Sequence, residues 1–347
     1  MPVHPIANHR PAPRRILLIQ IRRLGDVVLT SSLLQDLHRA FPEAEIDFLV
    51  GHAAEPILRE HPLIRRRIVL DRRRPVRMWR LVRARRYDWI IDVQSNPRTA
   101  MLSLMSRARV RAGWDVRGWG WVYTHRLSRE RPPEYVVRER QRLLELLGVP
   151  VAPARPRLYL SDAERAQGEA DYHALGVPPD RARVGIVIGS QDQARTWRVA
   201  GYAAVIDALA ADGVAPIVFH MPGDDARVEQ LLSLTRSAIV VNVPDLRRFL
   251  GMLATCRLLI SANTGPAHIA DALDVPRVTI FGSTSHVAWS PTLPTVAVVR
   301  DERVPVMTLR EATRLVATGQ DLTAGVTAEM VLAAARKLLA MRDPASM

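Results

Sequence analysis

Short apolar runs alternate with amphipathic stretches along the first half of the chain. Apolar runs of strand length cover residues 15–21, 45–50 and 88–93. Between the first two, residues 27–41 carry apolar side chains at helical spacing, and further helical patterns follow at 56–61, 78–86, 97–107 and 134–147. Strands that alternate with helices in this way predict a parallel sheet with helices on both faces.

The second half repeats this alternation after residues 151–156, a proline-punctuated stretch that indicates a linker. Its apolar pattern predicts strands at residues 184–188, 216–220, 239–241, 256–261 and 277–281. It predicts helices at residues 162–175, 202–211, 225–235, 246–254, 266–273 and 327–340. The pattern favours no element over residues 291–323.

A chain of 347 residues exceeds what one hydrophobic core usually supports, so we expect two α/β domains. We expect the first over residues 1–155 and the second over 156–325, with residues 326–347 forming a closing helix and a short polar tail. With 48% hydrophobic residues, the chain is apolar enough to bury two cores.

Cys256, the single cysteine, lies in a predicted strand and excludes both a disulfide and a cysteine-based metal site. Residues 1–14 lack the apolar core of a signal peptide, and no run of membrane-spanning length occurs in the sequence. We therefore expect a globular protein of the cytoplasm.

The formal net charge of +14 indicates an anionic partner, such as nucleic acid, phospholipid or a phosphorylated glycan. Twelve arginines fall between Arg59 and Arg86. Since Lys337 is the only lysine, a compositional bias accounts for arginine over lysine. The bias does not account for the local excess of arginine over Asp and Glu. We therefore favour the interpretation that these arginines contact an anionic surface over the interpretation that they only face solvent.

The segment 261–270 turns a predicted strand directly into a helix through Thr264, Gly265 and Pro266. Gly265 permits close approach of a ligand, and Pro266 suits a first helical turn, whose free N–H groups bind anions. Phosphate is the expected guest, and His268 on the same turn is a further donor. The alternatives are an ordinary turn with Thr264 as N-cap, and a packed histidine.

A second polar turn, Arg22-Arg23-Leu24-Gly25-Asp26, follows the first predicted strand. In open α/β sheets this edge faces the ligand crevice, so Asp26 is placed either as a general base or as a helix N-cap. The Gly-x-Gly-x-x-Gly and Walker patterns are absent, which argues against a dinucleotide or P-loop site.

Two further strand ends of the second half carry polar side chains. After residues 184–188, Ser190 and Arg195 suit a phosphate, and Trp197 is expected to pack the loop down. After residues 216–220, Asp224 either accepts hydrogen bonds from ligand hydroxyls or caps the next helix. No metal-ligand spacing occurs, so no metal or other cofactor is expected.

These segments together resemble the glycosyltransferase family 9 enzymes, the ADP-heptose:lipopolysaccharide heptosyltransferases. The resemblance runs from about Arg15 to Leu339 and rests on the order and spacing of its motifs. They are residues 22–30, 41–47, 86–92, 195–197, 263–268 and 281–284. Residues 284–289 are most similar to the heptosyltransferase III branch.

The resemblance implies a GT-B fold, in which two Rossmann-like domains face one another across a cleft. It implies that the first domain holds a phosphorylated glycolipid acceptor, the lipopolysaccharide core, and the second holds ADP-heptose, with inversion at the sugar carbon and no metal. Asp26 matches the catalytic base, and Arg22, Arg23 and Gly25 belong to its acceptor-side loop. Matching donor-binding positions are Ser190, Arg195, Asp224, Asn263, Thr264, Gly265 and His268.

Such an acceptor lies at the inner face of the inner membrane, where the arginines of residues 59–86 would contact anionic lipid. The resemblance thus implies a cytoplasmic protein that is peripheral to the membrane and does not bind nucleic acid.

The sequence departs from the family pattern near the donor. Arg195 stands where lysine is usual, Asn263 replaces the usual aspartate, and Ser283 and Ser285 replace a Pro and an Asp. Because Asn263 carries no charge, a transferase for another nucleotide sugar or acceptor is an alternative. A non-catalytic protein that binds nucleic acid through its basic patch is a weaker one.

Overall fold

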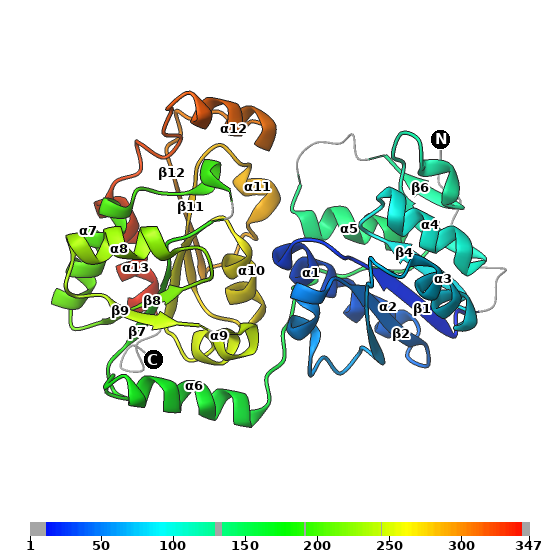
Figure 1. The fold of residues 1–347 in the computed structure, drawn as a ribbon, viewed down its shortest axis with the longest axis horizontal. Helices are drawn as coiled ribbons and strands as arrows, with labels where there is room; N and C mark the ends of the chain where they lie inside the picture. The colour runs from blue at the N-terminus through cyan, green and yellow to red at the C-terminus, as the bar shows by residue number, and fades with distance from the viewer. Residues whose placement is uncertain (1–11, 129–133, 191, 244, 342–347) are drawn as a thin grey trace. The chain divides into compact units, whose positions relative to one another are not determined.

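Two α/β units make up the chain (Figure 1). The computed structural model describes residues 12–128, 134–190, 192–243 and 245–341. The units are Met1–Tyr159 and Leu160–Met347, and each contains a six-stranded parallel sheet. The predicted fold class is confirmed, whereas most of the N-terminal stretch and the polar tail lie outside the described residues.

The sheet of the first unit has the strand order β3-β2-β1-β4-β5-β6. The chain places β2 on one side of β1 and β4 on the other, and such a reversal marks the ligand crevice of doubly wound sheets. The strands are β1 (Arg15–Ile19), β2 (Glu45–Val50), β3 (Arg66–Val69), β4 (Trp89–Asp92), β5 (Val110–Trp114) and β6 (His125–Leu127).

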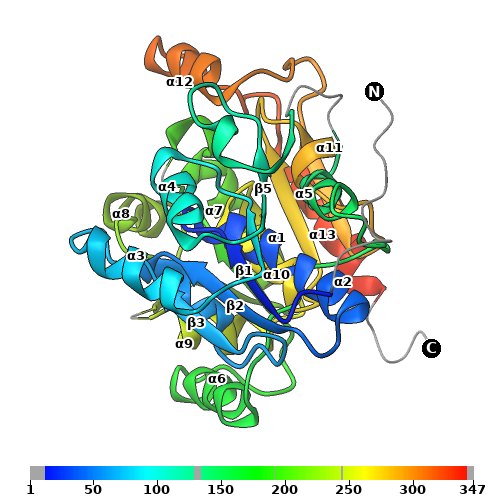
Figure 2. The same ribbon diagram turned by 90° about the vertical axis from the view of Figure 1, so that its right-hand side faces the viewer.

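Helices cover both faces of this sheet. Figure 2 shows α3 and α4 on one side of the strands, with α2 and α5 on the other. The helices are α1 (Leu24–Ser31), α2 (Leu33–Ala40), α3 (Pro75–Ala84), α4 (Pro97–Ser106) and α5 (Val136–Glu145), with short 3-10 turns η2 (His52–Leu58) and η3 (Gly120–Val122).

The single helix predicted over residues 27–41 is wrong, because the structure has α1 and α2 there. Three consecutive hydroxyls lie at the break and donate to carbonyls of the preceding turn: Thr30 to Asp26 (2.8 Å), Ser31 to Val28 (2.7 Å) and Ser32 to Leu29 (2.7 Å). Such side chains compete with backbone amides for the helical acceptors, which interrupts the helix at Ser32.

The sheet of the second unit has the order β12-β11-β10-β7-β8-β9. Its strands are β7 (Arg183–Val187), β8 (Ala215–His220), β9 (Ile239–Asn242), β10 (Leu258–Ala262), β11 (Arg277–Phe281) and β12 (Val296–Arg300). Its helices are α6 (Asp162–Ala174), α7 (Val199–Ala211), α8 (Asp225–Leu234), α9 (Leu246–Leu253), α10 (Gly265–Ala272), α11 (His286–Trp289), α12 (Leu309–Ala317) and α13 (Ala328–Ala340), with the 3-10 turn η4 (Gln193–Arg195).

Two details of this unit differ from the sequence analysis. The stretch 291–323, for which no element was favoured, contains β12 and α12. Cys256 lies before β10 instead of inside it. No helix in the described ranges is both long and apolar enough to cross a bilayer.

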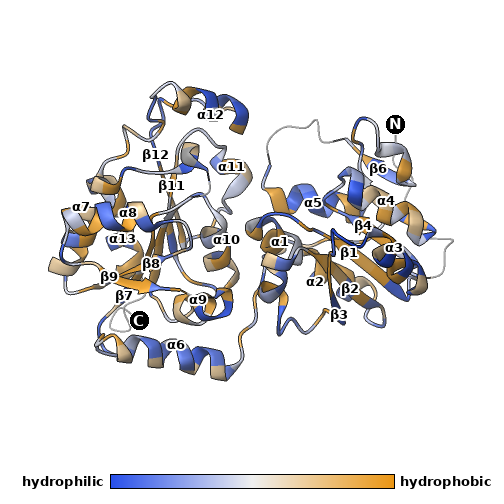
Figure 3. Cartoon of the chain, viewed as in Figure 1, coloured by the Kyte–Doolittle hydropathy of each residue, from blue (hydrophilic) through white to orange (hydrophobic). Residues whose placement is uncertain are grey.

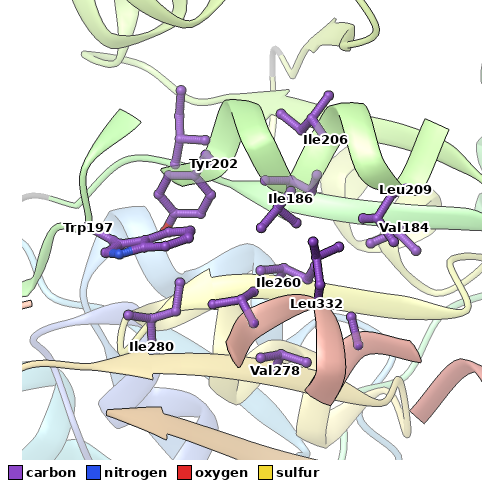
Figure 4. Close-up of a cluster of buried hydrophobic side chains, with 14 of the residues drawn as sticks. Val184, Ile186, Trp197, Tyr202, Ile206, Leu209, Ile260, Val278, Ile280 and Leu332 are labelled. Atoms are coloured by element: carbon purple, nitrogen blue, oxygen red, sulfur yellow. The ribbon is translucent and has the colours of Figure 1, made fainter. Parts of the chain in front are cut away.

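The core of the second unit forms between its sheet, α7 and α13 (Figure 4). Strand side chains such as Ile186 and Ile260 meet Tyr202 of α7 and Leu332 of α13. Trp197 is 1% exposed in this cluster, and its Nε1 donates to the carbonyl of Val326 at 3.1 Å, so the prediction that it packs its loop is confirmed. Figure 3 shows the same apolar interior in the strands of both units.

Candidate functional site

Asp26, the predicted base, is the third residue of α1. The N-cap position belongs to Arg23, whose side chain makes no capping hydrogen bond, so the N-cap interpretation of Asp26 is wrong. Arg23 has φ 55°, a conformation that costs a non-glycine residue on the order of 1–3 kcal/mol and that clusters at functional sites. Asp26 follows β1 at the edge where parallel sheets bind ligands.

Arg140 of α5 makes two contacts with Asp26. One guanidinium nitrogen, Nη2, donates to the Asp26 carboxylate at 2.5 Å, and the other, Nη1, donates to the Asp26 backbone carbonyl at 2.8 Å. The Arg140 side chain is 6% exposed and the Asp26 side chain 21%. Sequence reasoning missed Arg140, because 114 positions separate the two residues.

The turn before Asp26 is fixed to the turn that follows the neighbouring strand β4. The backbone N–H of Arg22 donates to the side-chain oxygen of Gln94 at 3.0 Å. The Gln20 amide donates to that same oxygen and to the carbonyl of Arg22, both at 3.0 Å. The side chains of Arg22 and Arg23 are exposed and Gly25 is buried, which leaves both guanidinium groups free to meet solvent at this edge.

A buried carboxylate supports the turn after β4. Asp92 accepts from the Ser95 backbone N–H at 2.8 Å and from the Tyr123 hydroxyl at 2.7 Å. Burial is the main cause that raises the pKa of Asp92 to about 6. Because Gln94 lies in this turn, Asp92 contributes indirectly to the position of Arg22.

In the second unit, the predicted donor residues follow the three neighbouring strands β8, β7 and β10, and β11 lies next to β10 in the sheet. Thr264 holds the N-cap position of α10, but its side chain does not cap the helix. Its hydroxyl donates instead to the carbonyl of Ala262 at 3.3 Å. Gly265 and Pro266 form the first turn of α10 as predicted, so the helix begins at the strand end.

Hydrogen bonds join three of these strand ends. Arg195, after β7, donates from Nη1 to the carbonyl of Asn263 at 3.3 Å, and its side chain is 17% exposed. Asn263, after β10, is 2% exposed and donates from Nδ2 to the Thr284 hydroxyl at 3.1 Å. Thr284, after β11, was not among the predicted site residues.

Asp224, which follows β8, lies close to Gly189, which follows β7. Asp224 occupies the N-cap position of α8 without a capping hydrogen bond from its side chain. A Cβ placed on Gly189 would overlap the carboxylate oxygens of Asp224, so only glycine fits beside this carboxylate. Burial is the main cause that raises the pKa of Asp224. Ser190 follows Gly189, and its hydroxyl accepts from the Asp192 N–H at 3.1 Å.

His268 lies on α10, and Ser285 is the N-cap residue of α11. His268 is 4% exposed and packs against Trp289, with the ring centroids 6.1 Å apart. Ser285 caps α11 by accepting from the Ala288 N–H at 3.2 Å. Two of the departures from the family pattern thus have hydrogen-bond partners in the structure: Asn263 bonds to Thr284 after the neighbouring strand β11, and Ser285 caps α11 within its own loop.

A basic groove lies between the edge strand β3 and helix α3. Residues 65–86 include eleven arginines and one acidic residue, Asp71. Arg67 pairs with Glu55 at 2.7 Å, whereas within the described ranges no ion pair involves Arg77, Arg80 or Arg83. The groove encloses about 460 Å³ and is lined by Arg65, Arg66, Arg67, Ile68, Val69, Asp71, Arg77, Met78, Leu81 and Arg85.

Comparison with known proteins identifies the family of this chain. The model of glycosyltransferase family 9 (heptosyltransferase) matches residues 75–340. Lipopolysaccharide heptosyltransferase 3 of Escherichia coli is 26% identical over 291 residues, which cover 77% of this chain and 83% of that protein.

Two solved structures share the fold. A glycosyl transferase family 9 protein from Veillonella parvula DSM 2008 has a TM-score of 0.81 at 21% identity, over 94% of this chain and 97% of that one. The Escherichia coli ADP-heptose lps heptosyltransferase II has a TM-score of 0.79 at 19% identity, over 94% and 99%. The fold is GT-B. Since the family model spans most of the sequence, the chain belongs to glycosyltransferase family 9 and is a glycosyltransferase.

Proposed function

We propose that this enzyme transfers heptose from ADP-heptose to the inner core of lipopolysaccharide. The family and its relatives support the reaction class, since a relative of this chain is a lipopolysaccharide heptosyltransferase and a structural neighbour is named for ADP-heptose. The observation that carries the proposal is the hydrogen-bonded set Arg195, Asn263 and Thr284, beside the start of α10. A cation and a helix N-terminus at adjacent strand ends suit a nucleotide diphosphate.

In the proposed reaction, Asp26 takes the proton from the acceptor hydroxyl as the hydroxyl oxygen attacks the anomeric carbon of the sugar. The new glycosidic C–O bond forms on the face opposite the diphosphate, so the configuration inverts. The bond from the anomeric carbon to the diphosphate oxygen breaks, and ADP leaves with the electron pair. Arg195 and the first turn of α10 stabilise the charge that develops on ADP.

Asp26→Asn tests this assignment. With ADP-heptose and a lipopolysaccharide acceptor, we expect kcat to fall about 10²- to 10⁴-fold, the range for loss of a general base. Asp180→Asn, which changes an exposed turn residue of the second unit, is the control. Full activity of Asp26→Asn would remove Asp26 from the mechanism.

We propose further that transfer needs no metal ion. Arg195 and the first turn of α10 would stabilise the negative charge of the diphosphate in its place. Among the residues that the structure describes, no group of three or more His, Cys, Asp or Glu side chains could hold a metal. The enzyme should keep its activity after dialysis against EDTA. A loss that Mg²⁺, Mn²⁺ or Fe²⁺ restores would overturn this part of the proposal.

A second candidate for the donor follows from Asn263, because this residue is neutral and its amide donates a hydrogen bond to the Thr284 hydroxyl. A nucleotide sugar other than ADP-heptose would then be the substrate. A panel of ADP-, UDP- and GDP-sugars, run with the wild type and with Asn263→Asp, separates the two. ADP-heptose as the best donor of the wild type supports the first candidate, and any other best donor supports the second.

We also propose that the protein works in the cytoplasm, at the inner face of the inner membrane, with the basic groove and α3 toward anionic lipid. Arg77, Arg80 and Arg83 are exposed on α3, and a cation near an anionic bilayer contributes about 1 kcal/mol. Changing all three to Gln should weaken binding to vesicles of phosphatidylethanolamine and phosphatidylglycerol about 10²-fold.

The control carries the same loss of charge elsewhere, as Arg165→Gln, Arg310→Gln and Arg314→Gln at exposed positions of the second unit. We expect this control to bind like the wild type, and binding of the wild type to fall with added salt. Equal loss in both triple variants would mean that net charge acts without a localised surface, and the membrane proposal would fail.

A further inference from the structure

We propose that Arg140 is a positioning residue for catalysis, which fixes the Asp26 carboxylate in the orientation that accepts the acceptor proton. This inference rests on the proposed role of Asp26 as the general base. It assigns a function to a residue of α5 that lies 114 positions further along the chain.

The two contacts of Arg140 constrain both the main chain and the side chain of Asp26. Nη1 holds the backbone carbonyl at 2.8 Å, and Nη2 holds Oδ1 at 2.5 Å. A carboxylate tied at one oxygen to a guanidinium that is also tied to its own backbone has little freedom to rotate. The contacts occupy Oδ1, so Oδ2 is the oxygen assigned to the incoming proton.

The helix that carries Arg140 is itself fixed by the adjacent residue. Gln141 donates from Nε2 to Oδ2 of Asp36 at 2.6 Å and to the carbonyl of Ala152 at 2.7 Å. Asp36, on α2, is fully buried and also accepts from the backbone N–H of Ala152 at 3.2 Å. Since α1 and α2 are consecutive, the Gln141 contact with Asp36 holds α5 against the same pair of helices that carries Asp26.

Arginine suits this position for two chemical reasons. A guanidinium has five N–H donors and no acceptor, so it does not compete with Asp26 for the acceptor proton. Its planar fork reaches two acceptors at once, which the single ammonium of lysine does not reproduce. A guanidinium also remains a donor to the protonated carboxyl group, so the contact persists through proton transfer.

Kinetics of Arg140→Gln and Arg140→Lys test the proposal. A misplaced catalytic group costs about 10²-fold in rate, so we expect kcat to fall about 10²-fold for Gln and by a smaller factor for Lys. The KM for ADP-heptose should stay within about twofold, because the donor residues lie in the other unit. Arg142→Gln is the matched control, since Arg142 lies on the same helix and pairs with Glu134.

A purely structural role for Arg140 makes a different prediction. If Arg140 acts through the carboxylate, Arg140→Gln adds little to the loss already caused by Asp26→Asn, whereas independent effects would multiply. In Arg140→Ala, millimolar guanidinium should restore part of kcat without changing the thermal midpoint. Additive losses in the double variant, or the absence of rescue in folded Arg140→Ala, would overturn the inference.

Two outcomes separate this inference from the proposed function. If Asp26→Asn is fully active, the base assignment itself fails and the role of Arg140 fails with it. If Asp26→Asn is inactive while Arg140→Gln and Arg140→Lys keep wild-type kcat, Asp26 stands and only the positioning role is wrong. Should the Gln variant fail to fold, the Lys variant and its thermal midpoint decide between these outcomes.

Discussion

Gly189 shows how one absent side chain shapes the surroundings of the proposed donor-binding residue Asp224. It directly follows Ile188 at the end of the β7 region, and its missing Cβ is the space that the Asp224 carboxylate occupies. Gly189 has no unusual φ, so close approach and not backbone freedom explains the residue. The position of the Asp224 carboxylate therefore depends on glycine at position 189.

We predict that Gly189→Ala displaces the carboxylate of Asp224 and weakens donor binding. We expect the KM for ADP-heptose to rise about tenfold, equivalent to about 1.4 kcal/mol, with a smaller change in kcat. Gly176→Ala is the control: its φ of 70° disfavours alanine, but open space surrounds it. The control should lose stability without a KM effect in steady-state kinetics, and an unchanged KM in Gly189→Ala would contradict this assignment.

Arg140 marks the limit of sequence reasoning at this scale. Asp26, Arg195, Asn263 and Thr264 follow strands, where a local pattern of apolar run and polar turn makes them visible. Arg140 lies mid-helix among other arginines, and only the docking of α5 onto α1 and α2 distinguishes it. A long-range partner of this kind leaves no periodic signal.

Elements with strong periodicity were predictable, and short or polar ones were not. The alternating pattern predicted β1, β2 and β4 because their apolar runs are buried on both faces. It missed β3, whose sequence Arg-Arg-Ile-Val reads as a charged loop and which lies at the sheet edge. It also missed β6, with three residues and no apolar run.

The turn after β4 should respond to pH through Asp92. Burial raises its pKa from 3.8 to about 6, so the folded chain binds this proton more tightly than the unfolded chain. Its contribution to stability is therefore full below about pH 4 and is lost as the pH rises through about 6. The loss amounts to at most about 3 kcal/mol.

Asp92→Asn should remove this dependence, since the amide stays neutral. The free energy of unfolding in urea, measured for the wild type and the variant at about pH 4.5 and about pH 7.5, tests this. Subtracting the change with pH of the variant from that of the wild type removes the contributions of the other titrating groups. One such group is His61, whose pKa burial lowers to about 4. An identical change of stability with pH in both proteins would contradict the assignment.

At the scale of the whole molecule, each unit has a sheet and a buried core of its own. Val331 and Leu338 of α13 belong to the core of the second unit, so residues 326–341 are part of that unit and not an appendage. Chains with separate cores generally unfold in separable steps.

We predict two transitions in calorimetry, of which ADP raises only that of the second unit. At about 100 times its Kd, ADP should stabilise that unit by about 2.7 kcal/mol. Leu338→Ala identifies the transition, because loss of a buried leucine costs about 2–5 kcal/mol and should lower only that step. An ADP effect confined to the step that Leu338→Ala leaves unchanged would mean that the donor binds elsewhere.

The separation of Asp26 from Arg140 along the chain also sets an order of events during synthesis. The ribosome adds about 5–20 residues each second, so the 114 positions from Asp26 to Arg140 take roughly 6–23 s to make. During that interval the residues of β1 and α1 lack the guanidinium that we propose orients the Asp26 carboxylate. Asp26 thus gains its contacts with Arg140 only after the residues of α5 have been made.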